Sequence, residues 1–114
     1  MRAPAHRQVD SVFGALADPT RRRVVETLAR GGTVTASGLA EQLPITRQAI
    51  AKHLSALHGA ELVTATRVGR ETRYELRPQP LDQAAEWIQM VSEEWDDRLD
   101  ALRRSVEKRA GRPK

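Results

Sequence analysis

The sequence predicts a mainly α-helical domain that carries one small β-hairpin, in the order α-α-α-α-β-β-α. Three observations predict this fold class. Apolar residues recur at gaps of three and four through two short runs within residues 38–63, the spacing of one helical face. Residues 62–76 then alternate around a Gly-Arg turn, as the strands of a hairpin do. Residues 81–109 return to the helical spacing in one long run.

The composition is that of one domain with a modest core, since the chain has 114 residues. Its net charge of +4 is uneven: residues 1–78 hold 12 Lys and Arg against 7 Asp and Glu. Residues 79–100 hold 1 against 7, and residues 101–114 hold 6 against 1. A basic body joined to an acidic helix is typical of a protein that presents only part of its surface to a polyanion.

Several classes of site and location are excluded by what the sequence lacks. Without cysteine it can form no disulfide, thiolate metal site or cysteine nucleophile. No apolar run approaches the roughly 20 residues that cross a bilayer, and nothing resembles a signal peptide. We therefore expect a cytoplasmic protein with a frayed N-terminus over residues 1–8, a domain over residues 9–109 and a basic tail over residues 110–114.

Two helices are expected ahead of residue 32. The first begins near Val9, and the second begins at Asp18-Pro19, with Asp18 as N-cap and Pro19 in the first helical position. Gly31-Gly32 ends the second helix. Its first turn carries Arg21, Arg22 and Arg23, and three cations there oppose the helix macrodipole. We therefore expect a partner for them, either an acidic patch within the protein or a phosphate.

Residues 38–63 predict two short helices joined by a tight turn. Pro44 disfavours helix at the residue before it, and Thr35 and Thr46 can cap the first and the second helix. The second helix is expected over residues 47–58, with Gly59 as a left-handed stop. This is a helix-turn-helix whose second helix is a recognition helix. Its outward side chains are small or carry donors that suit base edges and phosphates: Arg47, Gln48, Ala51, Lys52 and Ser55.

Residues 63–76 predict a hairpin with β-branched residues on both sides of a Gly69-Arg70 turn. Directly after a recognition helix, such a hairpin is the wing of a winged helix-turn-helix. Its Arg67, Arg70 and Arg73 can reach the DNA backbone or a narrow minor groove. The alternative is an ordinary edge hairpin whose charges discourage aggregation. The order of the elements favours the wing.

The final helix is expected over residues 81–109, with Pro78 and Pro80 breaking the chain before it. Its apolar stripe is longer than a monomer of this size readily covers, and a second copy of the chain would cover it. We expect its acidic flank to stay in solvent, away from nucleic acid. The expected dimer interface is Ile88, Val91, Trp95, Leu99 and Leu102.

Three segments together carry a resemblance to a known family: FGALADPTRRRVVETLARG, LAEQLPITRQAIAKHLSALHGAELV and RVGRETRYEL. They resemble the ArsR-type winged-helix repressors over residues 9–106. The resemblance implies a cytoplasmic homodimer, paired through its terminal helices, that binds an operator near its own promoter. It also implies release by a small effector in many members.

The resemblance does not extend to the metal ligands of the metal-sensing members. Their thiolate pair lies just ahead of the motif's first helix, where this chain has Thr35 and Ser37, and hydroxyls are poor ligands for soft metals. Other members use histidine and carboxylates of the last helix, and residues 79–114 contain no histidine. We therefore predict the metal-independent branch, with no metal and no other cofactor.

The sequence thus predicts a sequence-specific DNA-binding regulator, most simply a homodimeric repressor. The alternative is a winged-helix protein-interaction module without DNA binding, which a neutral wing would have favoured. An enzyme is rejected, because the chain has no nucleophile–base pair, Gly-rich phosphate loop or metal constellation. By the resemblance, His53 packs or touches phosphate. The expected DNA-contacting residues are Thr46, Arg47, Gln48, Lys52, His53, Ser55, Arg67, Arg70 and Arg73.

Overall fold

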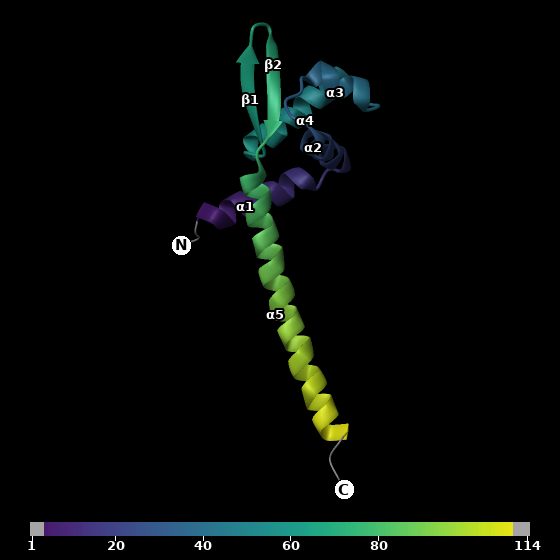
Figure 1. The fold of residues 1–114 in the computed structure, drawn as a ribbon, viewed down its shortest axis with the longest axis vertical. Coiled ribbons are helices and arrows are strands. Elements are labelled where there is room, and N and C mark those ends of the chain that lie inside the picture. The colour runs from purple at the N-terminus through teal and green to yellow at the C-terminus, as the bar shows by residue number, and fades with distance from the viewer. Residues whose placement is uncertain (1–3, 111–114) are drawn as a thin grey trace. The chain divides into compact units, whose positions relative to one another are not determined.

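The computed structural model describes the backbone of residues 4–110 and the side chains of residues 8–110. The chain divides into two compact units, Met1–Ala84 and Ala85–Lys114. Within the described part, no helix is both long and apolar enough to span a bilayer. The predicted order of elements is confirmed (Figure 1): α1 (Pro4–Leu16), α2 (Pro19–Arg30), α3 (Ala36–Gln42), α4 (Arg47–Gly59), β1 (Val63–Val68), β2 (Glu71–Leu76) and α5 (Pro78–Ala110).

Both ends of the chain differ from the expected boundaries. Helix α1 begins at Pro4, so residues 4–8 of the segment expected to be frayed are helical. Proline suits the first helical position, because the N–H that it lacks would have no intrahelical partner there. Residues 1–3 of that segment, and residues 111–114 of the expected basic tail, lie outside the described residues.

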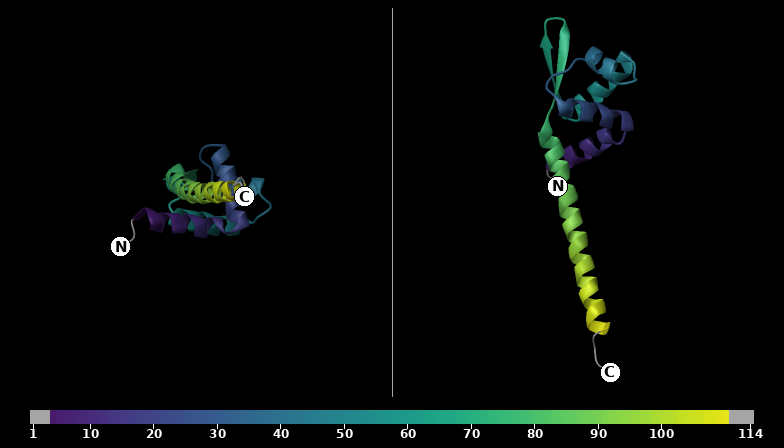
Figure 2. Two further views of the ribbon diagram at one scale, coloured as in Figure 1. Left: turned by 90° about the horizontal axis from the view of Figure 1, so that it is seen from below. Right: turned by 45° about the vertical axis from the view of Figure 1, so that its right-hand side comes forward.

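The core of the first unit explains how α4 is held. Ile50, Leu54 and Leu57 of α4 are fully buried. Helix α4 packs against α2 and α3, and the views in Figure 2 show these three helices together. The face of α4 opposite these three buried side chains is therefore free to meet a partner. Among the described residues of the unit, the fully buried aliphatic side chains include Val12, Val24, Leu39, Ile50, Leu54, Leu57, Leu62 and Val63.

Helix α4 ends one residue later than expected, and Gly59 is not its left-handed stop. Glu61 takes that role, with φ of 62°. The Glu61 N–H donates to the His58 carbonyl at 3.0 Å and the Leu62 N–H to the Leu57 carbonyl at 2.9 Å, the two bonds of a Schellman cap. Leu57 and Leu62 are both fully buried, so their packing fixes the stop although glutamate is a poor residue for it.

Two substitutions at this helix end are expected to stabilise the first unit. Glu61→Gly relieves the left-handed backbone and should raise the free energy of unfolding by about 0.5–1 kcal/mol. Gly59→Ala should raise it by a similar amount, about 0.5–1 kcal/mol, because Gly59 is helical. A Cβ at Gly59 meets no atom within 4 Å. Urea unfolding at fixed protein concentration measures both; a loss of stability in Gly59→Ala would show that Gly59 is the stop after all.

The hairpin is confirmed, and it is joined to the helical body by a bridge that was not expected. Strands β1 and β2 are antiparallel, from the pair Val63 and Leu76 to the pair Val68 and Glu71. Gly69 supplies the turn with φ of 63°. Val34 and Tyr74 exchange two backbone hydrogen bonds, at 3.0 and 2.7 Å. The loop before α3 is therefore fastened to the base of the hairpin.

Helix α5 begins at Pro78, so the two prolines lie in its first turn instead of ahead of it. Pro78 and Pro80 fit there because the first four N–H groups of a helix have no intrahelical acceptor. Residues 78–84 of the helix belong to the first unit, and the rest forms the second. In the second unit the side chains expected at the dimer interface are all exposed in the single chain: Ile88, Val91, Trp95, Leu99 and Leu102.

Candidate nucleic-acid interface

The exposed face of α4 begins at its N-cap. Thr46 Oγ1 accepts a hydrogen bond from the Ala49 N–H at 3.1 Å, which confirms the predicted cap. The side chains of Arg47 and Gln48 follow, and both are exposed. Together with Thr46 and Ala51 they line a hollow of about 410 Å³ at the start of the helix. Lys52 and Ser55 are exposed as well, so all the outward residues predicted for α4 lie at the surface.

His53 is the one predicted contact residue of α4 that is half-buried. Its Nδ1 accepts a hydrogen bond from Arg21 Nε at 3.3 Å, so a neutral ring carries its proton on Nε2. Hydrogen bonds from the backbone N–H groups of Arg21 and Thr20 lower the pKa of the Asp18 carboxyl. The Arg21 side chain, in the first turn of α2, thus positions the middle of the recognition helix through His53.

Arg21 and Arg22 of α2 have partners inside the protein, and both of these partners are neutral acceptors. Arg21 donates to His53, and Arg22 Nη1 donates to the Leu16 carbonyl at the end of α1, at 2.6 Å. Neither expected partner, an acidic patch or a phosphate, is needed to account for these two contacts. The unpaired carbonyls at a helix C-terminus attract a cation, which explains the position of Arg22.

Two of the three hairpin arginines, Arg67 and Arg73, lie on opposite faces of the hairpin. Arg67 is paired with Thr72 across the sheet, and Ala65 is paired with Tyr74, so these side chains share one face. Arg73 lies on the other face, where its Nε is 3.6 Å from Glu71 Oε2. Both members of that ion pair are exposed, so it contributes little to stability. Arg67 Nε donates to the Gly69 carbonyl at 3.2 Å, which holds this guanidinium beside the turn.

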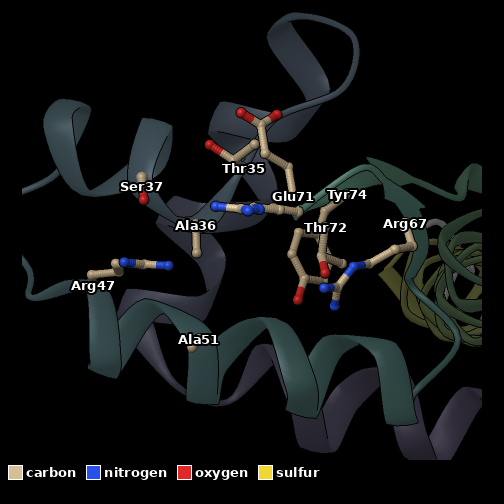
Figure 3. Close-up of a pocket in the computed structure, with 10 residues that line it drawn as sticks. Thr35, Ala36, Ser37, Arg47, Ala51, Arg67, Glu71, Thr72 and Tyr74 are labelled. Atoms are coloured by element: carbon tan, nitrogen blue, oxygen red, sulfur yellow. The ribbon is translucent and has the colours of Figure 1, made fainter.

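A cleft of about 370 Å³ lies between α3, α4 and the hairpin. In Figure 3, Arg47 of α4 and Arg67 of the hairpin enter it from opposite sides. Arg70 and Glu71 also line it, so the lining includes three arginines and one acidic residue, whose carboxylate pairs with Arg73. Guanidinium and hydroxyl groups are the usual partners of phosphate oxygens. The remaining lining residues are Thr35, Ala36, Ser37, Ala51, Thr72 and Tyr74.

The four hydroxyl residues of this cleft were not predicted as contact residues. Thr72 and Tyr74 could have been found from the alternation of the hairpin, which places them beside Arg67. Thr35 and Ser37 enter the cleft because the Val34–Tyr74 bridge draws the start of α3 to the hairpin. No sequence pattern signals that bridge.

The described residues hold no group of three or more His, Cys, Asp or Glu side chains that could bind a metal ion. At the position of the thiolates in metal-sensing relatives, the Thr35 hydroxyl accepts a hydrogen bond from the Gly38 N–H at 3.0 Å. It caps α3. Independence from metal stays a prediction.

Comparison with known proteins agrees with this geometry. Residues 16–65 match a family model described as a helix-turn-helix domain. The transcriptional repressor SdpR of Bacillus subtilis is 35% identical over 80 residues, 70% of this chain and 88% of that protein. An ArsR-like transcriptional regulator from Rhodococcus sp. RHA1 has a similar structure, with a TM-score of 0.76 and 38% identity, covering 98% of this chain and 100% of that one.

A second similar structure is the homodimeric winged helix-turn-helix DNA-binding domain of a Mycobacterium bovis protein, solved by NMR. It has a TM-score of 0.61 and 27% identity, covering 76% of this chain and 80% of that one. The predicted winged helix-turn-helix fold and the predicted family are thereby confirmed. This chain belongs to the ArsR family of winged helix-turn-helix transcriptional regulators.

Proposed function

We propose that this protein is a homodimeric repressor that binds operator DNA with α4 in the major groove and the hairpin over the adjacent backbone and minor groove. The cleft between α4 and the hairpin carries this proposal. The major groove is wide enough for an α-helix. The sugar–phosphate backbone that separates the major groove from the minor groove must then pass between α4 and the hairpin, at the cleft that Arg47, Arg67 and Arg70 line.

The proposed repression and pairing are supported by relatives. One similar protein is named a transcriptional repressor, and one similar structure is a homodimer. Pairing through α5 is supported by its apolar side chains, of which Trp95 is 59% exposed and Leu102 61% exposed in the single chain. Single exposed apolar residues are common, but a continuous stripe of them marks an interaction surface. We place the protein in the cytoplasm, with release of the operator by a small effector resting on the family resemblance.

The experiment that tests this proposal compares Arg67→Ala with Arg73→Ala in gel-shift titrations at several salt concentrations. Arg67 faces the cleft and Arg73 does not. Arg67→Ala should weaken operator and scrambled DNA alike, and it should reduce the salt slope by about one unit per arginine lost, hence about two per dimer. Arg73→Ala is the matched control and should leave the slope nearly unchanged.

Two results would count against the proposal in different ways. An equal effect of both substitutions would show that the DNA backbone does not lie in the cleft, and it would leave the proposal of DNA binding intact. No shift of any DNA by the wild-type protein would favour the protein-interaction module.

Metal should not change operator binding, because Thr35 and Ser37 stand where thiolates would be needed. We expect the same operator affinity with Zn²⁺, with Cd²⁺ and with a chelator, measured by fluorescence anisotropy. A tenfold loss in one of these conditions, equal to about 1.4 kcal/mol, would reveal a metal site formed by other residues.

A further inference from the structure

We propose that the hollow at the start of α4 receives the methyl group of a thymine, so that Thr46 and Ala51 help to select operators with A·T pairs at that position. The inference rests on the proposed binding of operator DNA by α4 and adds the base that one part of this helix recognises. Three observations support it: small side chains on the outward face of the helix, the apolar surface of the hollow, and the direction of the Arg47 guanidinium.

Small side chains occupy the outward face of α4. Ala51 and Ser55 are four residues apart, so they lie one above the other along the helix, and both are exposed. Ile50 and Leu54 lie on the other side of the helix and are fully buried. Because neither Ala51 nor Ser55 extends far from the backbone, this face of α4 can approach the edges of the base pairs closely.

The hollow beside Ala51 has a mainly apolar surface. The Thr46 hydroxyl oxygen is held by its capping bond with the Ala49 N–H, at 3.1 Å, so the methyl group is the part of Thr46 that suits the hollow. Base pairs present donors, acceptors and the thymine methyl group in the major groove, and only the methyl group is apolar. It is therefore the one group that gains free energy by leaving water for this surface.

Arg47 also lines the hollow, and a guanidinium group there would favour guanine. Figure 3 shows the Arg47 guanidinium directed into the cleft between α4 and the hairpin instead. The part of Arg47 that remains beside the hollow is its hydrocarbon stem. The arrangement thus assigns the guanidinium to the DNA backbone and leaves the hollow to an apolar group.

Gln48 supplies the polar contact that accompanies the methyl group. Its side-chain amide can pair with N6 and N7 of an adenine. Side chains three residues apart on a helix, such as Gln48 and Ala51, have Cβ atoms about 5–6 Å apart. Successive bases of a DNA strand are about 3.4 Å apart along the axis. The adenine at Gln48 and the thymine methyl group at Ala51 therefore lie within one or two base-pair steps of each other.

Replacing thymine with uracil tests the inference, because it removes the methyl group and leaves the hydrogen-bonding groups of the base unchanged. The operator is first isolated by selecting bound duplexes from a random-sequence library with the wild-type protein. Uracil is then placed at each thymine in turn, and the affinity is measured by fluorescence anisotropy. At one thymine of each half-site we expect uracil to weaken binding about fourfold, the factor for burying one methyl-sized group. Uracil in both half-sites should weaken it about sixteenfold.

Ala51→Val shows whether that thymine lies at the hollow. The added methyl groups occupy the space beside position 51, so this variant should bind the uracil duplex as well as the thymine duplex, or better. His58→Val is the matched control, because it places the same residue at an exposed position of α4 that does not line the hollow. It should keep the fourfold preference for thymine. The uracil series with the wild-type protein decides the inference even if Ala51→Val does not fold.

The outcomes separate the inference from the proposed function. A preference for thymine at one position per half-site that is lost in Ala51→Val supports the inference. Equal binding of thymine and uracil duplexes at every position, a preference that persists in Ala51→Val, or a selection that enriches no sequence would overturn it and leave DNA binding intact. Failure of the wild-type protein to retain any duplex would overturn the proposed function and the inference together.

Discussion

Replacing Trp95 with glutamate is expected to convert the dimer into monomers and to remove operator binding, although no residue of the recognition helix changes. Trp95 lies at the centre of the exposed stripe of α5. A glutamate there would be buried without a partner in both chains of the pair, and an uncompensated buried charge costs several kcal/mol. A monomer holds one DNA-binding unit, so it also loses the gain in affinity that comes from linking two.

The first unit should stay folded in this variant, because Trp95 belongs to the second unit and is exposed in the single chain. Sedimentation measures the loss of the dimer, and gel-shift titration measures the loss of operator binding. Gln89→Glu is the matched control, since it adds the same charge on the face of the helix away from the stripe and should remain a dimer. If the Trp95→Glu protein sediments as a dimer, α5 does not form the dimer interface.

Replacing Gln48 with alanine is expected to reduce the preference for the operator over scrambled DNA by about 1–3 kcal/mol, provided that its amide makes a bidentate contact to a base. Gln48 is exposed in the first turn of α4, beside the hollow that Thr46 and Arg47 also line. In helix-turn-helix proteins this end of the recognition helix meets the base edges. The affinity for scrambled DNA should change little, because nonspecific binding depends on the cationic side chains.

Competition titrations with operator and scrambled duplexes measure this preference. Gln79→Ala, at another exposed glutamine in the first turn of α5, is the control for a general effect of losing an amide. An unchanged ratio of the two affinities in Gln48→Ala would show that Gln48 does not read a base.

The parts of the fold that could be predicted are those that short stretches of sequence determine. Asp18 before Pro19, and Thr46 before Arg47, each place a capping oxygen beside free N–H groups, so both helix starts were correct. The stop of α4 could not be found this way, because a glutamate holds the left-handed position. The buried pair Leu57 and Leu62 fixes it there, and burial is a property of the whole core.

The candidate site was predictable residue by residue but not as an arrangement. Arg47 and Arg67 were expected at the DNA, and the structure places both at one cleft. That Arg73 faces away follows from the strand register, which the sequence suggests but does not determine. The contact of Arg21 with His53 joins residues 32 positions apart, and nothing local signals it.

The bridge between Val34 and Tyr74 attaches the hairpin to the helical body at one end only. Its base is clamped to the loop before α3, while residues 66–73 extend past the clamp as a two-stranded ribbon, a structure with little rigidity of its own. The core beneath α4 fixes the position of Arg47 in the helix, whereas Arg67 and Arg70 lie on the less rigid end of the hairpin, residues 66–73. We therefore expect the span between them to adjust to the groove width of the bound sequence, so that operators with narrower and wider minor grooves would be bound by the same three arginines.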